Sequence, residues 1–188
     1  MANDSTFSKY IKPIIVLVGI CLVISAALAA TYGVAAPRIE ARAIADANAA
    51  RQELLPEADS FTAYEGALWA SDDGKVEVTE VSVADNKSGV VMTVVTTSFG
   101  GKLTEMVGIG ADGAITGVKV TDHADTPGVG TKAHTADHLA TYKGLSELAD
   151  ISAKKMNMHV SGASVSSNGV HYGVYGALKQ FEQMGGVN

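Results

Sequence analysis

The feature that most constrains this chain is an uncharged, apolar segment near its N-terminus. No charged residue occurs between Lys12 and Arg38, a stretch of 25 residues (13–37). Because an α-helix rises about 1.5 Å per residue, such a stretch would extend roughly 37 Å as a helix, more than the bilayer core of about 30 Å. The sequence therefore predicts a transmembrane helix over residues 13–36, preceded by a short tail (1–12) and followed by a larger polar remainder.

Two other interpretations of this segment remain open. A cleavable signal peptide would combine the basic tail with a small-residue site at Ala27–Ala29. A lipoprotein would be acylated at Cys21, although the preceding Ile20 is bulkier than the small residue usual at that position. Apolar sequence continues to Ala36, which favours a retained anchor over either alternative.

The charge distribution bears on orientation and on partners. The formal net charge is −6, and the tail, with one aspartate and two lysines, contributes +1, so the rest of the chain carries −7. A slightly basic tail favours a cytoplasmic N-terminus with the larger domain outside, whereas three arginines at 38, 42 and 51 favour the reverse. An acidic remainder repels the phosphate backbone, so we expect no nucleic-acid partner.

Cysteine usage limits the redox chemistry that is open to this chain. Cys21, inside the apolar segment, is the only cysteine. One cysteine can form neither an internal disulfide, nor a four-thiolate iron–sulfur centre, nor a Cys-x-x-Cys-His haem attachment. A redox function would therefore need another cofactor.

The remainder predicts an α+β fold. Residues 38–55 are rich in alanine and are expected to form a helix that ends before Pro56, so residues 37–56 would continue the span as a stalk. Residues 57–188 are expected to form one domain, with antiparallel strands separated by short glycine-containing turns and with packed helices. The expected strands are 75–83, 90–97, 103–109 and 114–120, and the expected helices are 135–154 and 168–184.

Three familiar patterns give no site. Gly108–Gly113 matches G-x-G-x-x-G, but the following residues alternate like a strand, so we assign these glycines to a hairpin turn and not to a dinucleotide site. His134 and His138 lie four residues apart without an obvious third ligand, so we expect two solvated histidines and no metal centre. No G-x-S-x-G elbow frames a serine, and no catalytic residue is predicted.

Two polar segments have the composition of ligand-binding loops. Asp122–Lys132 follows a strand and combines proline and glycines with hydrogen-bonding side chains that could surround a polar planar ligand, although a plain Pro-Gly surface turn remains open. Val160–Val170 carries four serines ahead of the expected last helix, where backbone N–H groups suit a phosphate. The alternative there is a capping turn with Ser167 or Asn168 as the N-cap residue.

Together these two segments resemble the covalent FMN-binding domain family. Ser161-Gly-Ala-Ser164 is similar to the family's [ST]-G-A-[ST] motif, in which a separate flavin transferase esterifies the final hydroxyl to the FMN phosphate. His123-Ala-Asp-Thr-Pro-Gly-Val-Gly130 is similar to the family's H-A-E-T-P-G-x-G loop, which lies against the flavin. The order of span, stalk, strands, loop and hydroxyl motif most resembles the G subunits of Rnf-type ferredoxin–NAD oxidoreductase complexes. The C subunits of sodium-translocating NADH–quinone reductases are the second match.

The resemblance implies a role for each matching residue. Ser164 would carry FMN as a covalent phosphoester, and Ser161, Gly162 and Ala163 would shape the turn around the phosphate. The remaining implied FMN-binding residues are His123, Asp125, Thr126, Gly128 and Gly130 in the loop and Ser167 in the hydroxyl segment. Ser166 and Ser167 are the alternative acceptors.

Three positions depart from the family pattern. Ser164 stands where threonine is most frequent, yet it offers the same nucleophilic oxygen. Asp125 replaces the usual glutamate and reaches about one methylene less far. Met158 occupies a position where the family often has aspartate, which bears on recognition by the transferase.

The resemblance also implies a function. The chain would be a membrane-anchored electron-transfer subunit with covalent FMN, without a complete active site of its own, in a complex with other membrane and redox subunits. Its FMN domain would lie on the outer, periplasmic side of the cytoplasmic membrane, and a flavin transferase would act on it during maturation. The alternatives are a subunit of a sodium-translocating NADH–quinone reductase and a non-redox anchored domain that binds a ligand or partner through the Pro-Gly loop.

Overall fold

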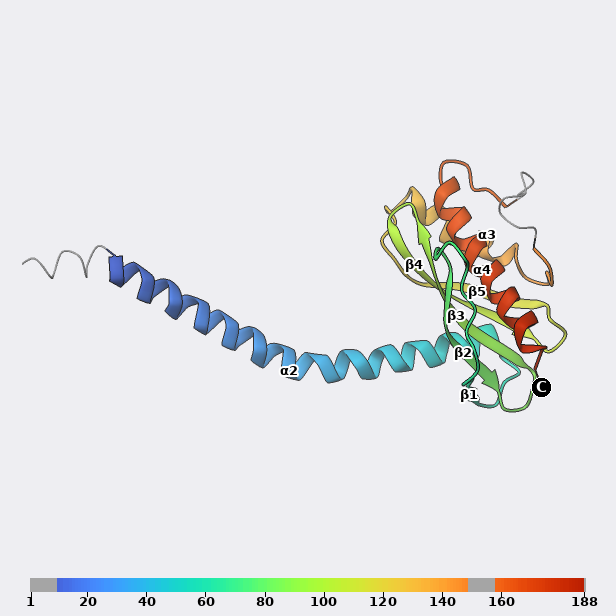
Figure 1. The fold of residues 1–188 in the computed structure, drawn as a ribbon, viewed down its shortest axis with the longest axis horizontal. Coiled ribbons are helices and arrows are strands. Elements are labelled where there is room, and N and C mark those ends of the chain that lie inside the picture. Colours follow the sequence, from blue (N-terminus) through green and yellow to red (C-terminus); the bar gives the residue numbers. More distant parts are fainter. Residues whose placement is uncertain (1–9, 149–157, 188) are drawn as a thin grey trace, which may run out of the picture. The chain divides into compact units, whose positions relative to one another are not determined.

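A computed structural model describes residues 10–148 and 158–187 of the chain, which divides into two units, Met1–Ala47 and Asn48–Asn188. One helix, α2 (Lys12–Leu54), forms most of the described part of the first unit and continues into the second (Figure 1). It is long and apolar enough to cross a membrane by length and composition. The segments expected as span and stalk belong to this single helix, which contains Pro37.

The second unit contains a five-stranded antiparallel sheet in the order β1-β2-β3-β4-β5, so that each strand pairs with its neighbour in sequence. The four predicted strands are confirmed, as is the hairpin turn after Gly110, where Gly113 has a φ of 81°. The strands are β1 (Phe61–Ala63), β2 (Glu77–Ala84), β3 (Gly89–Ser98), β4 (Gly101–Gly110) and β5 (Ile115–His123).

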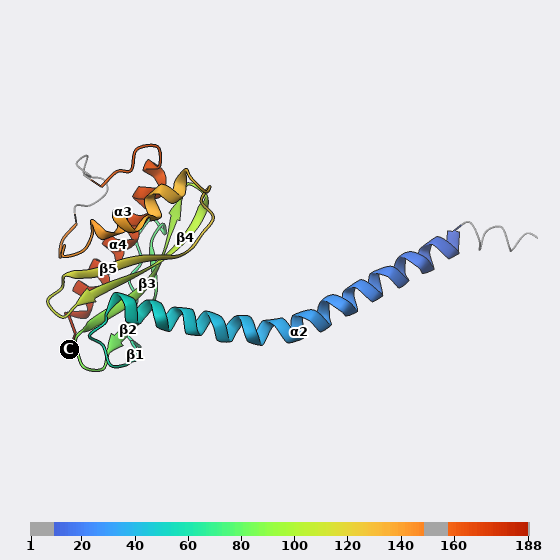
Figure 2. The same cartoon turned by 180° about the vertical axis from the view of Figure 1, so that it is seen from behind.

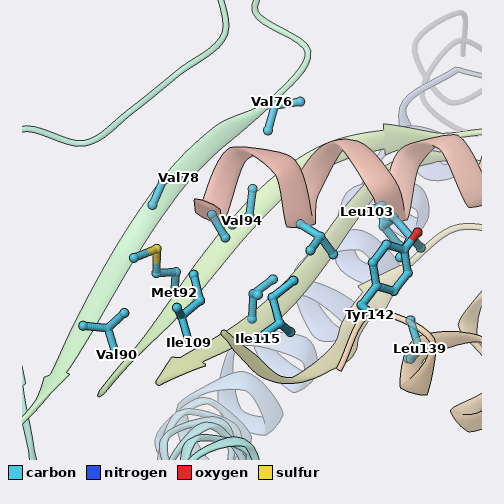
Figure 3. Packing of buried hydrophobic residues seen from close by; sticks show 14 of the residues in the cluster. Val76, Val78, Val90, Met92, Val94, Leu103, Ile109, Ile115, Leu139 and Tyr142 are labelled. Atoms are coloured by element: carbon cyan, nitrogen blue, oxygen red, sulfur yellow. The ribbon is translucent and has the colours of Figure 1, made fainter. Parts of the chain in front are cut away.

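Helix α4 (Ser164–Met184) packs on one face of the sheet, against β2, β3 and β4 (Figure 2). Glycines on its inner side permit the close approach: a methyl group on Gly169 would lie 2.8 Å from the backbone oxygen of Thr97. This contact places the start of α4 beside the end of β3. The hydrophobic core lies between this helix and the strands (Figure 3) and includes Val76, Val78, Val90, Met92, Val94, Leu103, Val107, Ile109, Ile115, Tyr142, Val170 and Val174.

The last turns of α2 pack against the sheet within the second unit. A methyl group on Gly117 would lie 3.0 Å from Cδ2 of Leu54, and the Thr116 hydroxyl donates a hydrogen bond to the Leu54 carbonyl oxygen at 2.5 Å. Arg51 reaches Glu80 on β2 at 2.6 Å. The helix therefore ends on the sheet, and the predicted α+β architecture is confirmed.

The connection between β5 and α4 differs from the prediction. It contains a 3₁₀ helix, η2 (Gly130–His134), and a short helix, α3 (Ala136–Ala140), so a continuous helix over 135–154 is wrong for the described residues up to 148. The chain leaves the helix because Gly144, with a φ of 83°, donates its N–H to the Ile115 carbonyl oxygen, and Ile115 donates in turn to Leu145. Positions 149–154 of that prediction lie outside the described residues.

Candidate functional site

The hydroxyl motif, Ser161–Ser164, begins with a tight turn over residues 160–163, called the hydroxyl turn below, that leads directly into α4. The Ala163 N–H donates to the Val160 carbonyl oxygen at 2.9 Å, and Gly162 has a φ of 81° at the third position of this turn. A positive φ at that position is the mark of a type II turn and explains why glycine occupies it. The helix begins at Ser164 rather than at the predicted position 168, so Ser164 lies in its first turn.

The prediction of Ser167 or Asn168 as N-cap is wrong, because the N-cap residue is Ala163. Ser167 instead holds the turn from inside the helix. Its hydroxyl donates to the Ala163 carbonyl oxygen at 2.7 Å and accepts the Val160 N–H at 3.2 Å. The serine that was expected to face the cofactor is therefore part of the support beneath the turn.

The four serines of the motif segment differ in exposure. Ser161 and Ser164 are exposed, whereas Ser166 and Ser167 are buried, with 1% and 0% of their surface accessible. A bulky group can reach the first two without a change in the helix. Attachment to either buried serine would require the first turn of α4 to open.

The segment Asp122–Lys132, called the Pro-Gly loop or Pro-Gly segment here, contains a second compact turn. The Thr126 carbonyl oxygen accepts the N–H groups of Val129 and Gly130, each at 3.1 Å. Gly128 has a φ of 76°, a conformation that glycine adopts without strain, and its N–H donates to the Thr131 hydroxyl at 2.8 Å. Thr126, Gly128 and Val129 are exposed, so the tip of this loop faces solvent.

Asp125 joins three segments that are far apart in sequence. Its side chain has no accessible surface, and Oδ1 accepts the Gly100 N–H from the β3–β4 hairpin at 2.7 Å. A methyl group on the buried Gly130 would lie 2.8 Å from the Asp125 Cβ and 2.9 Å from the Ser166 hydroxyl oxygen. The hairpin, the Pro-Gly loop and the first turn of α4 therefore meet around this carboxylate. Both Asp125 and Gly130, expected to line the cofactor, lie beneath the surface.

His134 extends this buried polar group. Its Nε2 lies 3.1 Å from the Asp125 Oδ2, its side chain is 7% exposed, and the exposed His123 ring lies 4.6 Å from it, centroid to centroid. Burial raises the pKa of Asp125, but hydrogen bonding by the Gly100 N–H and neighbouring hydroxyls lowers it more. The pKa of His134 is lowered, first by burial and then by His123.

The expectation of two solvated histidines is therefore wrong. His134 belongs to η2 and turns toward Asp125, whereas His138 belongs to α3, where its ring packs edge-on to Tyr142 at 5.8 Å. Burial lowers the pKa of His138. The four-residue spacing suggested one helical face, but the two histidines belong to two different short helices and pack against different partners.

The sequence did not single out Lys132, although it is the only basic residue apart from histidine between positions 122 and 132. This exposed side chain extends from η2 toward the hydroxyl turn, and its Nζ lies 4.0 Å from the position that a methyl group on Gly162 would occupy. Three exposed apolar side chains also belong to the converging segments: Phe99 on the hairpin, Val129 on the loop and Val165 beside Ser164. No local sequence pattern indicates that Lys132 lies near the hydroxyl turn or that these three apolar side chains belong to one region.

Replacement of Asp125 by alanine is expected to lower the free energy of unfolding by about 2–4 kcal/mol, because the Gly100 N–H loses its acceptor and His134 loses the carboxylate beside it. Since the folded state lowers the pKa of Asp125, its contribution is present above the ordinary value of 3.8 and is lost as the pH falls through the lowered value. Urea titrations at pH 7 and pH 3, followed by Trp69 fluorescence, test this. Equal losses for Asp125→Ala and for the control Asp122→Ala, an exposed aspartate on β5, would contradict it.

Comparison with known proteins identifies the region that contains these segments. Residues 98–179 match the FMN-binding domain family, a range that begins at the β3–β4 hairpin and includes the Pro-Gly loop, the hydroxyl turn and most of α4. A crystal structure of Shewanella oneidensis NqrC is similar with a TM-score of 0.44 and 24% identity, over 58% of this chain and 61% of that chain.

Similarity to curated proteins extends over nearly the whole chain. The G subunit of the Na(+)-translocating ferredoxin:NAD(+) oxidoreductase complex of Acetobacterium woodii is 28% identical, with 90% of each chain covered. The G subunit of the ion-translocating oxidoreductase complex of Methanosarcina acetivorans is 30% identical, with 89% of this chain and 92% of the relative covered. The resemblance inferred from the two motifs is thus confirmed, and the chain belongs to the family of G subunits of ion-translocating oxidoreductase complexes.

Proposed function

We propose that this chain is the membrane-anchored electron-transfer subunit of an ion-translocating ferredoxin–NAD oxidoreductase complex, with FMN attached through its phosphate to Ser164. The observation that carries the proposal is the position of Ser164. It is exposed in the first turn of α4, directly after a type II turn and inside the region that matches the FMN-binding domain. Ser164 Oγ would act as a nucleophile once, during maturation by a flavin transferase: it would lose its proton and bond to the flavin-bearing phosphorus of an activated flavin donor while the bond from that phosphorus to the donor's leaving group breaks.

The residues around Ser164 suit this cofactor. Ser161, Gly162 and Ala163 form the turn that would hold the phosphate, and the free N–H groups at the start of α4 favour an anion there. The exposed His123, Thr126 and Gly128 would border the ribityl chain or the ring. Asp125, Gly130 and Ser167 would act from beneath by fixing the loop and the turn.

Phe99, Val129 and Val165 provide exposed apolar surface from the same three segments. An isoalloxazine ring has two flat, largely apolar faces, so covering these side chains would remove apolar area from water. The bound flavin supplies one- and two-electron chemistry, and the chain supplies its position and surroundings. No residue of this chain is assigned as an acid or base in turnover.

We further propose that α2 anchors the chain in the cytoplasmic membrane with the FMN domain on the outer side. The helix has the length and composition for a span, and the slightly basic tail favours a cytoplasmic N-terminus. Away from the cytoplasm, free FMN is scarce, so a covalent bond would prevent loss of the cofactor. The other membrane and redox subunits of the complex would be its partners for electron transfer.

Coexpression with a flavin transferase tests the proposed function. The full chain, denatured and separated on a gel, is expected to fluoresce yellow-green under ultraviolet light. A phosphoester bond survives denaturation, whereas FMN that is bound without a covalent bond is released from the unfolded chain. The same chain expressed without the transferase serves as the control and should be dark. A dark band from cells in which the transferase modifies another substrate would contradict covalent attachment.

A further inference from the structure

The Lys132 side chain, which follows the Pro-Gly turn in sequence, lies beside the hydroxyl turn. Residue 132 lies on η2, six positions after the start of the Pro-Gly turn, yet its ammonium nitrogen is 4.0 Å from the methyl position of Gly162, thirty residues later. Glycine at 162 leaves this approach free of any side chain. Lys132 is thus a cationic group that tertiary structure places beside the turn preceding Ser164.

In the part of the chain that the structure describes, Lys132 has no carboxylate partner. Among residues 10–148 and 158–187, no aspartate or glutamate forms an ion pair with Lys132, and the first turn of α4 contains no acidic residue. Asp125, the buried carboxylate at the centre of the site, accepts the Gly100 N–H and lies 3.1 Å from His134 Nε2. An exposed ammonium group on a flexible stem can therefore bind an anion that arrives at the turn.

We propose that Lys132 binds the phosphate group of the flavin, as a positioning residue that acts through charge. This proposal rests on the proposed function, because it requires the flavin phosphate to lie at the Ser161–Ser164 turn. A phosphate ester linked to Ser164 and to the ribityl chain keeps one negative charge at neutral pH. A lysine ammonium pairs with such a charge as a point cation, and it does not need the fixed planar geometry of a bidentate arginine.

The test separates phosphate binding from covalent attachment. In the full chain carrying Ser164→Ala, no ester can form at position 164, and FMN and riboflavin can be titrated as free ligands by quenching of their fluorescence. The ratio of the two dissociation constants reports the contribution of the phosphate alone. We expect FMN to bind more tightly than riboflavin, and we expect Lys132→Gln to reduce this preference about fivefold. Lys132→Arg should retain most of it.

Lys87→Gln in the Ser164→Ala background is the matched control, since it removes the same charge from the β2–β3 turn. An unchanged preference for FMN in Lys132→Gln, or an equal loss in Lys87→Gln, would overturn the proposal. The proposed function would fail on a different observation, a dark gel band from the chain that retains Ser164 and is coexpressed with the transferase. The two failures are therefore distinguishable.

If Ser164→Ala binds neither flavin measurably, the flavinylated chain decides the question. There we expect the flavin fluorescence of Lys132→Gln to depolarise faster than that of Lys87→Gln, because the phosphate loses its ion pair and the flavin gains freedom of motion. Phosphorus NMR of the same samples should show a shift of the phosphodiester resonance only for the Lys132 variant. Identical anisotropy decay and identical resonances in the two variants would overturn the proposal.

Discussion

Replacement of Ser164 by alanine is expected to abolish covalent flavin in a chain coexpressed with the transferase. Alanine has no nucleophilic oxygen, and the neighbouring serines are poor substitutes. Ser166 and Ser167 are buried, and the Ser167 hydroxyl is engaged with Ala163 and Val160. The ratio of flavin to protein absorbance after denaturation measures the result. We expect a ratio near that of a sample without the transferase.

Two matched variants make the Ser164 prediction specific. Ser164→Thr keeps a hydroxyl in the same place and should retain covalent flavin. Ser161→Ala removes the other exposed hydroxyl of the motif and should also retain it. Full flavinylation of Ser164→Ala, together with its loss in Ser161→Ala, would move the acceptor to Ser161 and contradict the assignment.

Replacement of Glu105 by glutamine is expected to stabilise the protein at neutral and alkaline pH. Glu105 lies on β4 under α4 and has no accessible surface, and neither of its carboxyl oxygens has a hydrogen-bond partner among the described residues. A methyl group on Gly173 would lie 1.9 Å from Oε1, so glycine on α4 makes room for this side chain. Burial raises the pKa of Glu105 well above its ordinary value of 4.5.

The raised pKa of Glu105 determines whether the free energy of unfolding rises or falls with pH. The unfolded chain releases the Glu105 proton near the ordinary value, whereas the folded chain retains it to higher pH. The free energy of unfolding therefore falls as the pH rises between the two values, by about 1.4 kcal/mol per pH unit. Tyr142 does not titrate in this range, because burial, and then the nearby Glu105, raises its pKa. Glutamine cannot ionise, so Glu105→Gln should lose this part of the slope.

Urea titrations of the full chain at pH 5, 6, 7 and 8 measure the Glu105 effect through Trp69 fluorescence. The difference in unfolding free energy between Glu105→Gln and the parent should grow with pH. Glu77→Gln, at an exposed glutamate on β2, is the control and should leave the slope unchanged. A parent and a Glu105→Gln variant with parallel pH dependence would contradict the prediction.

Local patterns in the sequence predicted those parts of the fold that depend on local properties. Alternating apolar residues predicted β2 and β5, runs between short glycine-containing turns predicted β3 and β4, and the uncharged stretch predicted the long apolar helix. Strand β1 has only three residues, too few to show a period, and it forms through pairing with Ser82–Ala84. The expected helix over 135–154 was wrong because backbone pairing of Gly144 and Leu145 with Ile115, a contact distant in sequence, overrides helix propensity.

In the site, too, the sequence predicted the local motifs but not the contacts that depend on tertiary packing. The two motifs predicted which segments matter, and the structure brings them together around Asp125. The sequence did not reveal that Asp125 and Ser167 support the site from below, because burial depends on how the hairpin, the loop and α4 pack. Lys132 was missed for the same reason, since its partner turn lies thirty residues further along the chain.

The most direct test of covalent attachment at Ser164 is peptide mass spectrometry on the full chain isolated from cells that express the flavin transferase. Cleavage after lysine releases the peptide Met156–Lys179, which contains every serine of the motif segment. We predict that this peptide carries the mass of FMN less one water and that its fragment ions place the addition on Ser164. An unmodified peptide from a fluorescent protein band, or an addition on any other residue, would contradict the proposed attachment.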